Sequence, residues 1–251
     1  MPTISLVTGA SRGLGRNTAL AIARHGGDVI VTYRSGAAAA RDVVAEIEAL
    51  GRKAVALEFD VTSISIFPDF VAKVRSALTE HWGTATFDHL VNNAGQGEMA
   101  SLADTTEQQF DALFDTHVKG PFFLTQALLP LLADKGRIIN FSSGLTRVSF
   151  PGFSAYAAAK GAIEVLTVYM AREFGGRGIT SNVVAPGAIE TYFLGGAVRD
   201  MPDLNQQFAQ MTALGRVGLP DDIGPMVASL LGPDNGWVTA QRIEVSGGQT
   251  I

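Results

Sequence analysis

Short runs rich in β-branched residues alternate with longer helical patterns along almost the whole chain, and this alternation limits the folds that it can adopt. The expected strands lie at residues 4–8, 28–33, 54–59, 89–92, 137–141, 180–184 and 242–245. The expected helices lie at about residues 13–25, 37–50, 65–82, 105–132, 154–174 and 221–231. The pattern predicts an α/β fold, a doubly wound, Rossmann-type parallel sheet with helices on both faces.

The size and composition of the chain fit one such domain. Its 251 residues, 47% of them apolar, are enough for one large core, so we expect residues 1–251 to form a single domain. The net charge is -5, and the lysines and arginines are scattered rather than gathered in a basic stripe, which argues against a nucleic-acid partner. The absence of cysteine excludes disulfides and thiolate metal sites, and we expect no metal. With no signal peptide and no span long enough for a bilayer, we expect a cytoplasmic protein without a membrane partner.

A glycine-rich segment lies between the first expected strand and the first expected helix. Gly9, Gly13 and Gly15 follow the spacing Gly-x-x-x-Gly-x-Gly. Such a turn brings backbone N–H groups and the positive end of a helix dipole close to a pyrophosphate. Glycines also serve ordinary tight turns, so position rather than composition supports a nucleotide site.

The residues after the second expected strand indicate which nucleotide is bound. An acidic residue there would bind a ribose without a 2′-phosphate, but this chain has Arg34 followed by Ser35. Arg34, helped by Arg12, suits a 2′-phosphate and therefore predicts NADP(H). The alternative is that Arg34 is a solvated surface arginine.

A tyrosine and a lysine four residues apart suggest acid–base chemistry. On a helix, Tyr156 and Lys160 share one face, one turn apart. A neighbouring ammonium should lower the tyrosine pKa from about 10 toward neutrality, so that the phenol can exchange a proton near pH 7. Ser143 follows the apolar run at residues 137–141, so its hydroxyl is expected at a strand end. A Tyr-x-x-x-Lys pair alone also occurs by chance in helices.

Together, these motifs resemble the short-chain dehydrogenase/reductase family over essentially the whole chain. The resemblance rests on motif order, on the Asn92-Asn93-Ala94-Gly95 segment and on the interval from Ser143 to Tyr156 and Lys160. It implies the following cofactor-binding residues: Gly9, Ser11, Arg12, Gly13, Leu14, Gly15, Arg34, Ser35, Asp60, Val61, Asn92, Ala94, Gly95, Tyr156, Lys160, Pro186, Gly187, Ile189 and Thr191.

The resemblance also implies the reaction. Hydride would pass between NADPH and the carbon of a carbonyl or secondary alcohol, while Ser143 holds the oxygen and Tyr156 donates the proton. Lys160 would lower the tyrosine pKa and bind the nicotinamide ribose. Two residues have structural alternatives: Asn92 as a strand-end turn residue and Asp60 as a helix N-cap.

One position departs from the family pattern. The family's fourth catalytic residue is an asparagine that supports a proton-relay water, and the corresponding residue here is His117. A histidine with a pKa near 6.5 could hold that water or relay the proton itself. It could also be a hydrogen-bonded structural residue, or mark a non-catalytic NADP(H)-binding regulatory protein.

The family resemblance assigns the segment at about residues 190–212 to a mobile substrate lid. Tyr192, Phe193, Leu194, Met201 and Phe208 make this segment apolar, and we expect a carbonyl or alcohol substrate with apolar bulk near the reacting carbon. Further apolar candidates for the pocket are Met99, Leu145, Phe150 and Phe153. The family also pairs the Tyr156 helix with symmetry mates, which implies a homotetramer or homodimer.

Overall fold

The computed structural model describes residues 2–251 and contains one seven-stranded sheet in which every neighbouring pair is parallel. The strands, in the spatial order β3-β2-β1-β4-β5-β6-β7, confirm the expected strands to within a few residues. Their bounds are β1 Ile4–Val7, β2 Asp28–Tyr33, β3 Ala54–Glu58, β4 Phe87–Asn92, β5 Leu132–Phe141, β6 Thr180–Pro186 and β7 Arg242–Val245. The order reverses between β1 and β4, and ligands of such sheets bind outside the strand ends at this point.

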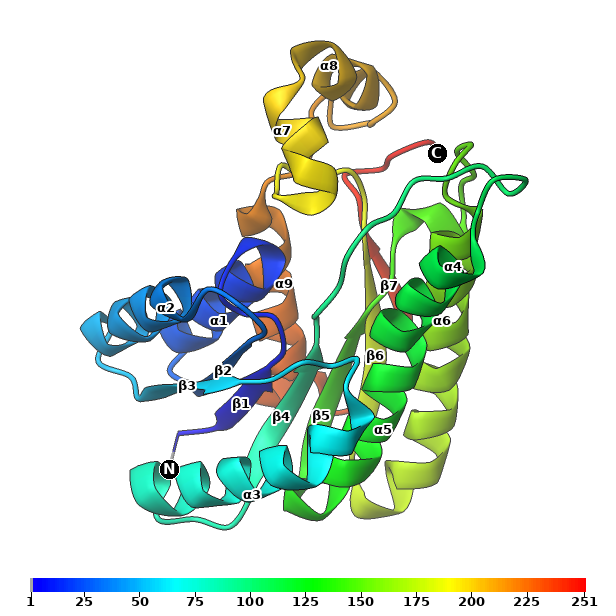
Figure 1. Ribbon diagram of the computed structural model, residues 1–251. Coiled ribbons are helices and arrows are strands. Elements are labelled where there is room, and N and C mark those ends of the chain that lie inside the picture. Colours follow the sequence, from blue (N-terminus) through cyan, green and yellow to red (C-terminus); the bar gives the residue numbers. More distant parts are fainter. Residues whose placement is uncertain (1) are drawn as a thin grey trace.

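Helices cover both faces of the sheet, so the five inner strands are buried on both sides (Figure 1), whereas the edge strands β3 and β7 are partly buried. One layer contains α1 (Gly13–Arg24), α2 (Ala37–Ala49) and α9 (Pro220–Leu231), and the other contains α3 (Phe67–Ala77), α5 (Gly120–Leu128) and α6 (Ser154–Phe174). Burial on both faces explains why the strands read as continuous apolar runs rather than alternating ones.

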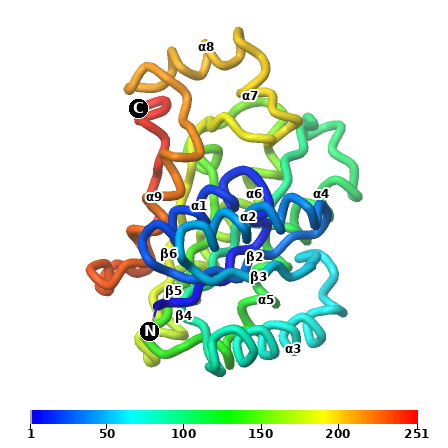
Figure 2. The backbone as a smooth tube through the Cα atoms, turned by 90° about the vertical axis from the view of Figure 1, so that its left-hand side faces the viewer, coloured from blue at the N-terminus to red at the C-terminus, as the bar shows by residue number. Residues whose placement is uncertain are grey.

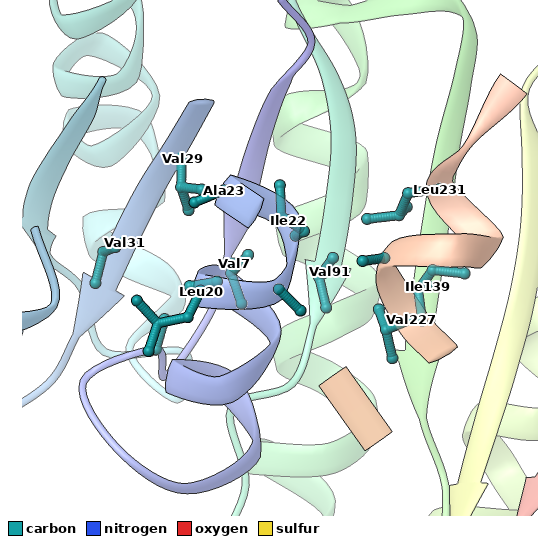
Figure 3. Close-up of a cluster of buried hydrophobic side chains, with 14 of the residues drawn as sticks. Val7, Leu20, Ile22, Ala23, Val29, Val31, Val91, Ile139, Val227 and Leu231 are labelled. Atoms are coloured by element: carbon teal, nitrogen blue, oxygen red, sulfur yellow. The ribbon is translucent and has the colours of Figure 1, made fainter. Parts of the chain in front are cut away.

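The core beneath α1 and α9 is formed by small aliphatic side chains (Figure 3). Alternate strand residues contribute to it, whereas their chain neighbours face the second core under α3, α5 and α6. The first core contains, among others, Val7, Val29, Val31, Val91 and Ile139, and the second contains Leu6, Ile30, Leu90 and Ile138. Each fully buried side chain of this size contributes roughly 1.5–3 kcal/mol relative to an exposed one.

The prediction of one continuous helix at residues 105–132 is wrong, because a π-helical turn interrupts it. It consists of α4 (Glu107–Phe114), a π-helical turn at Asp115–Lys119, and α5. Pro121 lacks the N–H that an uninterrupted α-helix would donate to the carbonyl of His117, so the regular bonding pattern cannot continue. The interruption places His117 inside the π turn, which matters for the site below.

Two short helices above the carboxyl end of the sheet were not expected from the sequence. They are α7 (Ala197–Asp200) and α8 (Pro202–Gln210), and they stand apart from the helical layers (Figure 1, top). The C-terminus lies near them, whereas the N-terminus lies at the opposite end of the molecule (Figure 2). Within residues 2–251, no helix combines the length and apolarity needed to cross a membrane.

Candidate active site

The glycine-rich turn after β1 packs directly on the segment after β4. The Thr8 hydroxyl oxygen accepts the N–H groups of Asn93 and Ala94, both at 2.9 Å. Gly9 has a φ of +64°, and a Cβ there would lie 2.9 Å from the Ala94 Cα. A side chain at Gly9 would therefore be strained and would also push the two segments apart. The two glycine-containing segments form one unit at the point where the strand order reverses.

The beginning of α1 has the features of an anion site. Its N-cap residue, Arg12, makes no side-chain capping bond, so the first N–H groups of the helix have no side-chain acceptor. Gly13 has a φ of +57°, and a Cβ there would meet nothing within 4 Å. The turn thus leaves space beside free N–H groups, which fits a pyrophosphate. The Leu14 side chain packs on the core, so only its backbone is free to contact a ligand.

Two arginines near this turn have free charges. Arg12 and Arg34 are exposed, and neither pairs with a carboxylate among residues 2–251. Arg34 and Ser35 follow β2 at the carboxyl edge of the sheet. This placement fits the predicted contact with a 2′-phosphate.

Asp60 and Asn92 use their side chains within the protein. One carboxylate oxygen of Asp60 accepts the Thr62 N–H at 2.9 Å and the Thr62 hydroxyl at 2.8 Å, which is a local turn. Val61 is buried and packs close to Gly120. Asn92 donates to Asn140 Oδ1 at 2.8 Å, inside the sheet. Asp60 thus stabilises a turn rather than capping a helix, because the next helical turn begins at Ile64 with Ser63 as its N-cap. The Asn92 amide group supports the interior beneath the site.

The three predicted catalytic residues are close together at the end of β5 and the start of α6. Tyr156 lies in the first turn of α6 and Lys160 lies one turn later, and their side chains are only 6% and 5% exposed. The Ser143 side chain is close enough to Tyr156 to lower the pKa of the tyrosine. Lys160 Nζ donates to the Phe141 carbonyl at 2.8 Å and lies 5.6 Å from the centroid of the Tyr156 ring. The amino group is therefore inside the protein rather than in bulk water.

The expected fall of the Tyr156 pKa is wrong for the protein without a bound ligand. Burial raises the pKa of Tyr156 above its usual value, and the nearby Ser143 hydroxyl offsets only part of that rise. Burial also lowers the pKa of Lys160 to about 7. Both groups favour their neutral forms because the interior solvates charge poorly. Tyr156 thus keeps its proton at pH 7, which suits a proton donor.

His117 lies against Tyr156, with ring centroids 5.3 Å apart and the rings perpendicular. Its Nε2 lies 2.7 Å from the Gln96 carbonyl, and because a carbonyl only accepts, Nε2 carries the proton. Nδ1 is buried without a partner among the described residues. Burial and the nearby Lys160 charge hold the pKa of His117 well below 6.5. His117 is therefore a neutral imidazole with one free acceptor atom next to the tyrosine.

The segment after β6 is supported by the end of the chain. Gln249 Oε1 accepts the Ala188 N–H at 2.8 Å, and a Cβ on Gly187 would lie 2.6 Å from the same oxygen. Ile189 is buried, and Thr191 Oγ1 accepts the Phe193 N–H at 3.1 Å. The role of Gln249 was not predicted, because its partner is 61 residues away in the sequence.

An ion network that was also not predicted holds the strand end that carries Ser143. Arg242 donates to Glu164 at 2.8 Å and to the Ser143 carbonyl at 3.3 Å. Ser142 donates to the same Glu164 oxygen at 2.6 Å, and Arg242 also pairs with Glu244 at 3.0 Å. No local pattern in the sequence could reveal these contacts, since they join α6, β5 and β7.

The predicted lid lies over this site. The Phe193 ring centroid is 5.5 Å from that of Tyr156, and Phe208 of α8 meets Phe150 edge-on at 5.8 Å. A cavity of about 280 Å³ lies beside them, next to the start of α6. It is lined by Ser101, Leu102, Leu145, Ser149, Phe150, Pro151, Gly152, Phe153, Ser154 and Ala157. The structure thus brings three of the predicted pocket residues to one apolar cavity, and Met99 packs on Gly152 at its border.

Comparison with known proteins gives whole-length matches. Residues 9–250 match a family model described as enoyl-(acyl carrier protein) reductase. The hydroxynaphthalene reductase-like protein Arp2 of Metarhizium brunneum is 35% identical, with the match covering 98% of this chain and 94% of Arp2.

Two ketoreductases of known structure are similar along the whole chain. LugOII, described as a promiscuous reductase that catalyses keto-reduction at C1 during lugdunomycin biosynthesis, is 39% identical with a TM-score of 0.94, and the match covers 99% of this chain and 98% of LugOII. The angucycline C-6 ketoreductase LanV, solved with bound NADP, is 37% identical with a TM-score of 0.93, and the match covers 99% of this chain and 95% of LanV. LanV has also been solved with NADP and rabelomycin.

Proposed function

This chain belongs to the short-chain dehydrogenase/reductase family, and from that premise we propose that it is an NADPH-dependent reductase of ketones that carry apolar bulk beside the carbonyl. The observation that carries the proposal is the buried pair Tyr156 and Lys160, with Ser143 beside it, beneath an apolar lid. The named ketoreductase relatives support it, as does NADP bound to LanV.

The cofactor would be held by the glycine turn, the free N–H groups of α1, and the charges of Arg12 and Arg34. When bound, NADPH supplies the hydride that becomes bonded to the carbonyl carbon. The hydroxyl groups of Ser143 and Tyr156 would hold the carbonyl oxygen. Tyr156 gives its proton to that oxygen as the alcohol forms. The ammonium form of Lys160 would stabilise the phenolate that remains, and with a pKa of about 7 it can exchange a proton near neutral pH.

The proposal is tested by following NADPH absorbance with a panel of carbonyl compounds. We expect faster turnover of aryl ketones than of small hydrophilic keto-acids, because the cavity at the start of α6 is lined mainly by apolar side chains. Preference for the keto-acids would contradict the substrate class. NADPH binding without turnover of any compound would favour the non-catalytic regulatory alternative, which the buried catalytic cluster does not support.

The description of the matched family model suggests a second candidate, reduction of a carbon–carbon double bond next to a carbonyl. An α,β-unsaturated thioester in the same panel distinguishes the two reactions. Mass and NMR analysis of the product would identify a saturated thioester or an alcohol. We expect the alcohol from a ketone and no saturation of the thioester.

Replacing Arg34 with alanine should reduce the preference for NADPH over NADH about 10- to 100-fold. Arginine–phosphate hydrogen bonds are charge-assisted, and such a bond contributes about 1.5–3 kcal/mol. The measurement is the ratio of kcat/KM for the two cofactors. Arg24→Ala, an exposed arginine in the last turn of α1, is the matched control and should leave the ratio unchanged. An unchanged ratio in Arg34→Ala would refute the phosphate contact.

We propose that neutral His117 positions the site through its bond to Gln96 and offers Nδ1 to the proton relay. His117→Asn keeps a donor and an acceptor and should retain kcat within about twofold, whereas His117→Leu should lose about fivefold, since a neutral hydrogen bond contributes about 1 kcal/mol. Because the histidine pKa is well below 6.5, the pH profiles of wild type and His117→Asn should coincide between pH 6 and 8. If wild type shows a pH-dependent step near pH 6.5 that is missing in His117→Asn, the histidine takes up a charge during the relay, and the proposal is wrong.

An exposed apolar face on α5 and α6 supports the proposal of a homodimer or homotetramer. Phe122 and Phe123 of α5 and Val165, Val168 and Tyr169 of α6 are between 37% and 61% exposed. Exposed apolar side chains gathered on neighbouring helices often mark an interface. Light scattering should give a mass of two or four times 26.4 kDa, and a monomer would contradict this proposal.

A further inference from the structure

The lid contains three consecutive residues in the left-handed backbone region. The φ angles of Leu194, Gly195 and Gly196 are +49°, +71° and +89°. Glycine adopts this region freely, but leucine does so at a cost in free energy. Surrounding contacts must hold such a residue in place, and strained residues of this kind cluster at functional sites.

Leu194 and its neighbour Phe193 are held in place by contacts over Gly97. A Cβ on Gly97 would lie 2.7 Å from Cε2 of Phe193 and 2.9 Å from Cδ2 of Leu194. Real Cβ atoms do not approach other atoms this closely, so the two side chains occupy space that only glycine leaves open. Gly97 does not have a positive φ, and its backbone conformation would therefore accept another residue. Packing of the lid, rather than backbone conformation, explains the glycine at position 97.

The side chain seated on Gly97 also contacts the predicted proton donor. The rings of Phe193 and Tyr156 lie 5.5 Å apart at 55°. Tyr156 is 6% exposed, whereas Phe193 is 39% exposed, so Phe193 lies on the solvent side of the tyrosine and remains open to a ligand. A substrate whose carbonyl reaches the Tyr156 hydroxyl must then lie near the Phe193 ring.

We propose that Phe193, held in place by Gly97, is the specificity-determining residue that selects ketones whose carbonyl is attached to a planar aromatic ring. This inference rests on the proposed ketone reduction and specifies its substrate class. An aromatic ring beside the reacting carbonyl would pack against the exposed part of Phe193, and such aromatic pairs prefer offset or edge-to-face contacts. A saturated ring of the same skeleton is puckered and lacks the π-system that makes this contact favourable.

Two bicyclic ketones with the same carbon skeleton test the inference: 1-tetralone, which has an aromatic ring, and 1-decalone, which is saturated. We expect Phe193→Ala and the shape-conserving Phe193→Leu to lower kcat/KM for 1-tetralone about tenfold relative to 1-decalone. The matched control is Trp237→Ala, which removes an exposed aromatic side chain outside the lid and should leave the ratio unchanged. The Kd for NADPH, measured by fluorescence, should be the same in all four proteins.

A double-mutant cycle tests whether Gly97 acts through Phe193. Gly97→Ala should displace the phenylalanine and by itself reduce the preference for 1-tetralone, but it should have no further effect when Phe193 is already alanine. An unchanged ketone ratio in both Phe193 variants, or independent effects of the two positions, would overturn the inference while leaving ketone reduction intact. Absence of turnover of both ketones by the wild-type protein would instead contradict the proposed function together with this inference.

Discussion

Replacing Tyr156 with phenylalanine should lower kcat for ketone reduction by about 10³-fold. The change removes one oxygen and with it the proton that passes to the carbonyl oxygen, and a positioned general acid contributes about 10²–10⁴-fold. The packing should survive, because the phenylalanine ring can keep the contacts that Tyr156 makes with His117 and Phe193. The effect is measured as the rate of NADPH oxidation at saturating aryl ketone.

The same variant separates chemistry from binding. Since Tyr156 acts on the substrate oxygen, the Kd for NADPH should change less than about threefold in Tyr156→Phe. The melting temperature should stay near that of wild type, because the side chain fills the same volume. A variant that keeps more than a tenth of the wild-type kcat would show that another group donates the proton.

Replacing Lys160 with methionine should lower kcat/KM by about 10²-fold or more. Methionine fills a similar volume but cannot provide the ammonium that stabilises the phenolate of Tyr156 as its proton leaves. It also removes the hydrogen bond to the Phe141 carbonyl, which holds the end of β5 near Ser143. Retention of wild-type kcat/KM would contradict the assigned role of the lysine.

The free energies of unfolding of wild type and of Lys160→Met should respond differently to pH. The pKa of Lys160 is about 7 in the folded protein and about 10.4 in an unfolded chain, so the unfolded chain binds more protons between these values. Stability therefore increases with pH in this window, by up to roughly 1.4 kcal/mol per pH unit, as the cost of burying the ammonium disappears. Below pH 7 that cost is fully present.

Denaturant unfolding of the protein without NADPH at pH 7, 8 and 9 measures this effect. We expect wild type to gain free energy of unfolding relative to Lys160→Met as the pH rises. The gain belongs to the buried amine only if the exposed Lys73→Met shows no such trend relative to wild type. A difference between wild type and Lys160→Met that stays constant across this range would mean that Lys160 keeps its ordinary pKa.

The elements of the fold that depend on local pattern were predictable. All seven strands were expected. The inner strands are covered on both faces and must be apolar along their length, and such runs are visible in a single sequence, whereas the edge strand β7 alternates charged and apolar residues. The π turn at Asp115–Lys119 was not expected, although Pro121 is a visible signal of a break in a helix. The short helices α7 and α8 were not expected either, because neither helix contributes a residue to the two cores.

The arrangement of the site was only partly predictable. The sequence interval placed Tyr156 and Lys160 on one helix face, and the strand before Ser143 placed its hydroxyl at the carboxyl edge of the sheet. The contacts of Asn92 with Asn140, of Gln249 with Ala188, and of Arg242 with Glu164 join distant segments. No spacing rule connects such pairs, so their roles required the folded structure.

By itself, the sequence determined the order of strands and helices along the chain, the glycine turn before the first helix, and the one-turn separation of Tyr156 and Lys160. These features depend on dihedral preferences and periodicity, which act over a few residues. Only the tertiary structure decided that burial raises the Tyr156 pKa, that His117 is neutral with its proton on Nε2, and that Phe193 rests on Gly97. Solvation and packing depend on segments that meet only after folding, so no local pattern records them.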